Sequence, residues 1–140
     1  MVTRGDRVHA ALMRVVAAGT IAYWLAYFGY GAVQIGTDPG YVAFENAFPL
    51  ADTYMAVAYL VAAHLLVRGR MAAVPIGIAA GSAMVFLGLM DTLYNLEHGQ
   101  YAIRTPEMAT ETAINLVCLV FGPWTMVRLW GARRRLADRR

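Results

Sequence analysis

Acidic, amide and histidine side chains recur at regular spacing beside the apolar stretches of this 140-residue chain. Asp91, Asn95 and His98 are separated by four and three residues, which places them on one face of a helix. Their oxygen and nitrogen atoms are suited to a divalent metal ion, for which Asp91 and His98 are the candidate ligands. The same spacing is also explained by hydrogen bonds that fix the end of the helix, and this interpretation is favoured over a metal site. No other cofactor is predicted.

Carboxylates near one end of three predicted helices form a second candidate group. Asp52, Asp91 and Glu111 each lie about 24–31 Å from the arginine at the far end of their helix, at a rise of 1.5 Å per residue. Because successive helices run in opposite directions, we expect the three carboxylates at similar heights, with Glu45 just before them in the chain. Arg104 is the one arginine expected on that side. So many acids with so few basic partners are expected to share protons or to bind a metal ion or a cationic ligand.

Two predicted helices carry a polar stripe at helical spacing. The first stripe contains Thr20, Tyr23, Tyr27, Tyr30 and Gln34, and the second contains Glu111, Asn115, Cys118, Gly122 and Thr125. Polar side chains avoid lipid, so both stripes are predicted to face the interior of a bundle. The tyrosines are expected either to line a ligand cavity or to pack with their hydroxyls against neighbouring helices. The predicted ligand- or cation-binding residues are Tyr23, Tyr27, Tyr30, Glu45, Asp52, Asp91, Asn95, His98, Glu111 and Asn115.

The composition indicates a membrane protein. Hydrophobic residues make up 59% of the chain and charged residues 15%, against about 25% charged residues in soluble domains. Four uncharged stretches, at 15–33, 53–67, 71–90 and 112–127, approach the roughly 20 helical residues that cross a bilayer. We therefore predict an all-α integral membrane protein, a four-helix transmembrane bundle that forms a single membrane domain over residues 1–140. The predicted spans are about 14–35, 50–67, 71–95 and 107–130.

The arginines set the predicted orientation of these spans. Eleven of the twelve lie before the first span, between the second and third spans, or after the fourth. Both termini, including the basic tail 131–140, are therefore predicted to be cytoplasmic, with His9 in the segment before the first span. Seven of the nine acidic residues fall at the opposite side. We expect a multi-pass protein of a bacterial plasma (inner) membrane.

Local signals predict how the spans begin and how they pack. The apolar segment 41–48 carries three aromatic residues and is expected as a short helix at the membrane interface. Thr105 followed by Pro106 is typical of a helix start. The small residues of Gly77-x-x-x-Gly81 favour close packing of the third span against a helix of the same chain rather than dimerisation.

These features together predict an outward-facing cavity, lined by acids and tyrosines, that serves the binding or transport of a small ligand or cation. Two alternatives stay open: an accessory or structural subunit of a larger membrane complex, and a lipid- or quinone-modifying enzyme with Asp91, His98 and Glu111 as acid–base groups. Binding is favoured over enzymatic activity because polar stripes and convergent acids exceed what a passive anchor needs, and the enzyme stays an open alternative. The expected partners are the lipid bilayer, a small hydrophobic or cationic ligand, and further copies or subunits, but no nucleic acid.

Overall fold

The computed structural model describes residues 2–33 and 35–138, and the elements formed by these residues are all helices. In chain order they are α1 (Arg4–Tyr30), α2 (Pro39–Glu45), α3 (Pro49–Val67), α4 (Ala73–Glu97), the short 3-10 helix η1 (Gln100–Ala102) and α5 (Pro106–Ala137). Four helical stretches, namely α1, α2 with α3, α4 and α5, are long and apolar enough to span a membrane. The prediction of an all-helical chain with four such stretches is confirmed. Gln34 of the first polar stripe and Arg139 and Arg140 of the tail lie outside the described residues.

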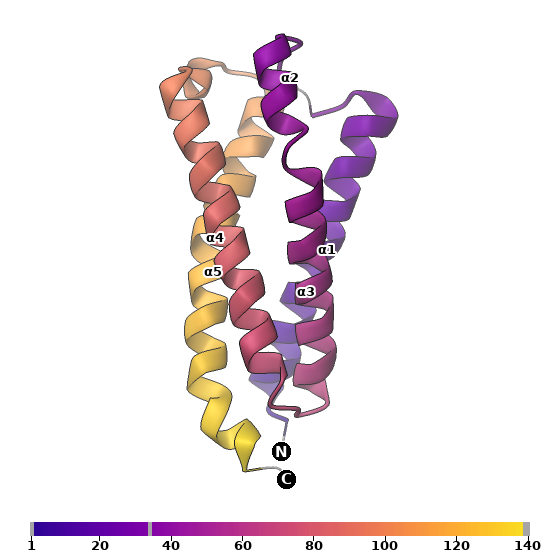
Figure 1. Ribbon diagram of the computed structural model, residues 1–140, viewed down its shortest axis with the longest axis vertical. Helices are drawn as coiled ribbons and strands as arrows, with labels where there is room; N and C mark the ends of the chain where they lie inside the picture. Colours follow the sequence, from indigo (N-terminus) through magenta and orange to yellow (C-terminus); the bar gives the residue numbers. More distant parts are fainter. Residues whose placement is uncertain (1, 34, 139–140) are drawn as a thin grey trace.

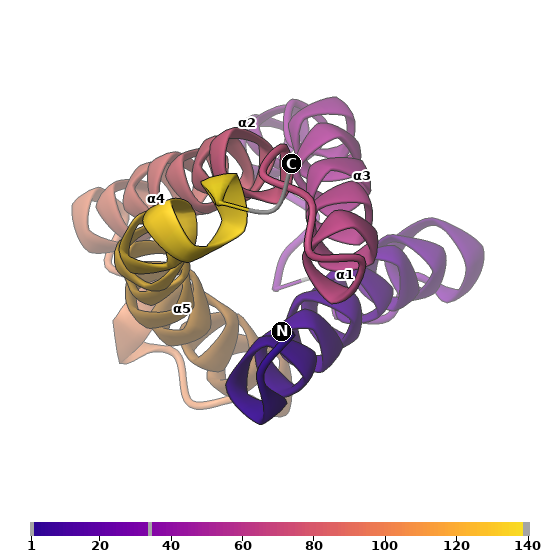
Figure 2. The same ribbon diagram turned by 90° about the horizontal axis from the view of Figure 1, so that it is seen from below.

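The four long helices form an antiparallel bundle (Figure 1). Both chain ends lie at one end of the bundle, here called the terminal end, and α2 lies at the opposite end, here called the α2 end. Seen from the terminal end, α1, α3, α4 and α5 follow one another around the bundle (Figure 2). Close packing joins α1 to α3, α3 to α4 and α4 to α5. Helices α1 and α5 lie near each other at the terminal end and diverge toward the α2 end.

Helix α1 differs in its bounds from the predicted span 14–35. Its start is fixed by a capping box, in which the backbone N–H of Asp6 donates to Thr3 Oγ1 at 3.1 Å and the backbone N–H of Thr3 donates to Asp6 Oδ2 at 2.9 Å. Its end is fixed by Gly31, whose φ of 62° is a left-handed conformation that glycine adopts without a steric penalty. The span was estimated from the absence of charge, whereas these caps allow a helix to include charged residues.

The predicted start of the last long helix is confirmed, whereas the short helix has other bounds than expected. Thr105 caps α5 by accepting a hydrogen bond from the backbone N–H of Met108 at 3.3 Å, and Pro106 occupies the first turn. The short helix expected at 41–48 is present as α2, which starts earlier because Asp38 accepts hydrogen bonds from the backbone N–H groups of its first turn.

Glycines allow α4 to approach α5 closely, as the intramolecular interpretation of Gly77-x-x-x-Gly81 predicts. A Cβ atom at Gly81 would lie 2.8 Å from the carbonyl oxygen of Gly122, and one at Gly77 would overlap Cδ1 of Leu129. At Gly81 the backbones of the two helices are therefore in contact, whereas Gly77 makes room for the side chain of Leu129.

The terminal end of the bundle is closed by polar and aromatic contacts between α1 and α5. Asp6 is 2% exposed and accepts two hydrogen bonds from the Arg135 guanidinium, at 2.8 and 2.9 Å. His9 is fully buried between two rings of α5, stacked on Phe121 and meeting the edge of Trp124. His9 was expected in the segment before the first span, but the early start of α1 brings it into the helix and into the interior.

Candidate ligand cavity

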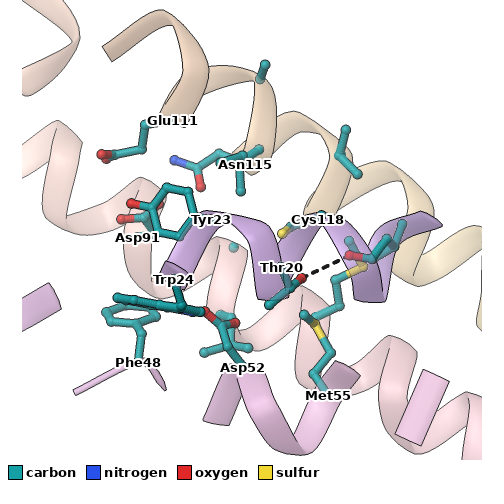
Figure 3. A pocket seen from close by; sticks show the side chains of 18 of the residues that line it. Thr20, Tyr23, Trp24, Phe48, Asp52, Met55, Asp91, Glu111, Asn115 and Cys118 are labelled. Atoms are coloured by element: carbon teal, nitrogen blue, oxygen red, sulfur yellow. Dashed lines mark hydrogen bonds between the residues drawn. The ribbon is translucent and has the colours of Figure 1, made fainter. Parts of the chain in front are cut away.

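A cavity of about 500 Å³ runs from the middle of the bundle toward the α2 end (Figure 3). Side chains of α1, α2, α3, α4 and α5 line it, together with Phe48 between α2 and α3. Most of its wall is apolar, and its polar groups are concentrated in four carboxylates and a few neighbours. We call this space the carboxylate cavity, after Glu45, Asp52, Asp91 and Glu111.

Each carboxylate of the cavity comes from a different helix. Glu45 on α2 and Glu111 on α5 are 5% and 4% exposed, whereas Asp52 on α3 and Asp91 on α4 are half-buried. Asp91 and Glu111 approach from facing helices, closely enough for their charges to repel each other (Figure 3). No basic side chain in residues 2–33 and 35–138 forms an ion pair with any of the four. The structure therefore collects four acidic side chains in a largely apolar space.

Hydrogen bonds distinguish Asp52 from Glu111. The indole N–H of Trp24 donates to Asp52 Oδ2 at 2.8 Å, which ties α1 to α3. The amide nitrogen of Asn95, a fully buried residue of α4, donates to Glu111 Oε1. Glu111 Oε2 is buried and has no hydrogen-bond partner among the described residues. A buried oxygen of this kind is costly unless something donates a hydrogen bond to it.

Aromatic and amide side chains complete the polar part of the cavity. Tyr23 and Trp24 meet edge to face, with ring centroids 5.2 Å apart, and the Tyr23 hydroxyl faces the Glu45 carboxylate. Asn115 lies one turn after Glu111 in the cavity wall and donates a hydrogen bond to the Tyr101 hydroxyl at 3.2 Å. The cavity thus offers carboxylate oxygens and the faces of aromatic rings at one end.

The deeper part of the cavity, toward the middle of the bundle, is apolar. Met55, Met84, Leu87 and Cys118 contribute side chains to it and are all buried. Thr20 is the polar exception, and its hydroxyl is occupied by a hydrogen bond to the Val16 carbonyl oxygen at 3.1 Å. The polarity of the cavity therefore changes along its length, from carboxylates near the α2 end to methionine and leucine in the middle.

The structure brings six of the ten predicted binding residues into the cavity wall. These are Tyr23, Glu45, Asp52, Asp91, Glu111 and Asn115. Asn95 lies behind this wall and orients Glu111, and Tyr27 is buried next to Tyr23 and Trp24 without lining the cavity. Tyr30 is 87% exposed, because it is the last residue of α1, where this helix has diverged from the bundle.

The two metal candidates are not brought together. Asp91 lines the cavity, but His98 is exposed at the end of α4, where its Nδ1 lies 2.9 Å from the Tyr94 carbonyl oxygen and its ring stacks on that of Tyr94. Within residues 2–33 and 35–138, no group of three or more His, Cys, Asp or Glu side chains has an arrangement that could hold a metal ion. The interactions of His98 fit the favoured alternative, in which it fixes the end of the helix.

Sequence reasoning missed Trp24 and Phe48, which contribute aromatic surface to the cavity. Trp24 lies four residues after Thr20, so the helical spacing used for the first stripe also reaches it. Phe48 gave no comparable signal, because its position depends on the short turn that joins α2 to α3.

Comparison with known proteins identified no relative of this chain. No family model, no curated protein and no solved structure matches the chain. The residues of the carboxylate cavity and their arrangement are therefore the basis on which its function is inferred.

Proposed function

We propose that the chain is a multi-pass protein of a bacterial plasma membrane, with the terminal end of the bundle in the cytoplasm. Four helical stretches are long and apolar enough to span a membrane. Arginines favour the cytoplasmic side of a membrane protein. Those near the terminal end are Arg4, Arg7, Arg14, Arg68, Arg70, Arg128, Arg133, Arg134 and Arg135, whereas Arg104 lies between η1 and α5 near the α2 end. In this orientation the carboxylate cavity belongs to the outward-facing half of the bundle.

We further propose that the carboxylate cavity binds a small organic cation. The observation that carries this proposal is Glu111 Oε2, which is buried, lacks a hydrogen-bond partner among the described residues and belongs to a cavity with three other carboxylates. Like charges in a poorly solvated space repel one another, and no basic side chain of the described residues compensates them. A cationic ligand supplies both the missing charge and the missing hydrogen-bond donor.

The apolar lining favours an organic cation over a bare metal ion. Calcium and magnesium ions require six or more oxygen ligands, so several oxygen-bearing groups must lie close together around the ion. The cavity instead combines carboxylates with the rings of Tyr23, Trp24 and Phe48, and aromatic faces attract ammonium groups. Its volume of about 500 Å³ is within the range of roughly 300–1,000 Å³ found for small-molecule sites. An amine with an attached ring or short alkyl group matches this combination.

Benzylamine and benzyl alcohol provide a direct test, because the two molecules differ little in shape and only the amine is charged at neutral pH. We expect calorimetric titration of the purified chain in lipid nanodiscs to show at least tenfold tighter binding of benzylamine. The same titration of the triple variant Asp52→Asn, Asp91→Asn, Glu111→Gln, which keeps Glu45, should show a strongly reduced preference for the amine. Equal binding of the two molecules to the unaltered chain, or an unchanged preference in the triple variant, would contradict the proposal.

A further inference from the structure

The carboxylate cavity opens on one side of the bundle. Six residues of its wall are exposed, and all six come from α1 or α5: Val15, Gly19, Thr110, Ala113, Ile114 and Val117. The wall residues contributed by α2, α3 and α4 are all buried or half-buried. The opening therefore lies between α1 and α5, where the two helices diverge, and not at the packed sides of the bundle (Figures 1 and 2).

This opening, here called the α1–α5 seam, is apolar and bounded at one end. Apart from the Thr110 hydroxyl, its side chains are small or aliphatic, and the Thr110 hydroxyl is occupied by a hydrogen bond to the Pro106 carbonyl oxygen at 2.8 Å. A Cβ atom at Gly19 would meet no atom within 4 Å, so the seam is open at that level. Toward the terminal end, the contacts of Asp6 and His9 with α5 close it.

We propose that the seam holds the alkyl tail of an amphiphilic amine whose ammonium group lies among the carboxylates of the cavity. This inference rests on the proposed binding of an organic cation and names the class of cation. Acidic side chains are concentrated at the α2 end of the cavity, and the seam beside it offers apolar surface on neighbouring parts of α1 and α5. A single molecule with a charged head and an apolar tail satisfies both parts, whereas a small hydrophilic amine leaves the seam unfilled.

The continuity of the seam with the carboxylate cavity argues for a lipid-like ligand rather than a helix from a second chain. An apolar helix packed across α1 and α5 would seal the cavity and leave Glu111 Oε2 without a donor. An alkyl tail fills the seam while its own head enters the cavity. In the proposed membrane orientation, the seam faces the acyl chains of the outer half of the bilayer, so an amphiphile reaches the cavity without passing through water.

The test compares benzylamine with 4-dodecylbenzylamine, which adds a tail to the same head. Both are titrated into the full chain in nanodiscs, with empty nanodiscs as the blank for partition into lipid. Gly19→Phe places a large side chain in the seam, where a Cβ atom meets no other atom within 4 Å. Gly29→Phe is its matched control on the same helix, since Gly29 also has open space around it but does not line the cavity. Partition of each amine into lipid is the same for all variants, so differences between the variants report the seam alone.

We expect Gly19→Phe to weaken binding of the dodecyl compound at least tenfold more than it weakens binding of benzylamine, because Gly19 lies in the cavity wall at the seam and carries no part of the carboxylate group. Gly29→Phe should leave both unchanged. As a second measurement, a photoreactive diazirine at the end of the dodecyl tail should label peptides that contain Val15 or Val117. If neither amine binds the unaltered chain, the proposed function itself fails. If both bind but Gly19→Phe leaves the dodecyl compound unaffected, or the label falls on α3 or α4, the seam inference is overturned while cation binding stands.

Discussion

The exchange Glu111→Gln removes one charge from the carboxylate cavity with little change of shape. A glutamine at this position keeps a side-chain oxygen that can accept the hydrogen bond from Asn95, so the contact between α4 and α5 is retained. What is lost is the negative charge next to the oxygen that lacks a partner. The variant therefore measures the contribution of charge to ligand binding, separately from packing.

The size of the effect follows from the burial of Glu111. An ammonium group about 4 Å from a carboxylate gains roughly 4 kcal/mol at an effective dielectric constant of 20. Glu111 is 4% exposed, which limits screening by water, but the open seam and the three remaining carboxylates reduce the loss to about half of that value. A loss of about 2 kcal/mol corresponds to a roughly 30-fold increase in the Kd of benzylamine.

The assay is calorimetric titration of benzylamine in nanodiscs, with Glu107→Gln as the matched control. Glu107 lies one turn earlier on α5, is half-buried and does not line the cavity, so its exchange changes the net charge of the chain by the same amount. We expect Glu107→Gln to change the Kd less than twofold. An equal effect of the two variants would mean that net charge alone attracts the amine, and an unchanged Kd in Glu111→Gln would refute the assignment of the ligand to this cavity.

Three further predictions concern the elements that shape the cavity, with thermal unfolding in detergent as the measurement. Asp6→Asn should lower the free energy of unfolding by about 2 kcal/mol, because its charged partners on α5 lose a buried carboxylate; an unchanged stability would show that the seam is not closed there. Gly81→Ala should cost about 1–3 kcal/mol, since its Cβ meets a backbone oxygen at 2.8 Å, whereas Gly29→Ala, in open space, should be neutral or stabilising. Thr105→Ala removes the α5 cap and should cost about 1 kcal/mol; no loss would show that Pro106 alone fixes the start.

Sequence reasoning predicted the helices and the heights of the acids because both depend on local or one-dimensional properties. Apolar stretches of sufficient length indicate the long helices, and the rise per residue places Asp52, Asp91 and Glu111 near one end. The capping residue Thr105 acts only on its own helix, so its signal is visible in the sequence. Small residues such as Gly81 predict that a close helix contact exists, but they do not predict which helix is the partner.

The features that sequence reasoning did not predict depend on how the helices tilt and where they end. Tyr23 and Tyr30 share a helix face in the sequence, yet one lines the cavity and the other is exposed, because α1 diverges from the bundle toward Gly31. His9 was predicted in the segment before the first span, where charged residues surround it, but the capping box at Thr3 extends α1 through it. The seam is likewise a product of divergence between helices, which no spacing of residues encodes.

The acids of the cavity could not be distinguished in the sequence, but they differ in their hydrogen bonds in the structure. Asp52 already accepts a hydrogen bond from Trp24, and that bond holds the α1 wall of the seam against α3. Glu111 is held by Asn95 through one oxygen, and its other oxygen lies buried without a donor. A carboxylate that is satisfied by the protein contributes mainly to the shape of the cavity, whereas one that is oriented but unsatisfied is prepared for a ligand. Position along the helices therefore identified the group of acids, and the missing hydrogen bond at Glu111 Oε2 is the reason why we propose that Glu111 receives the ammonium group.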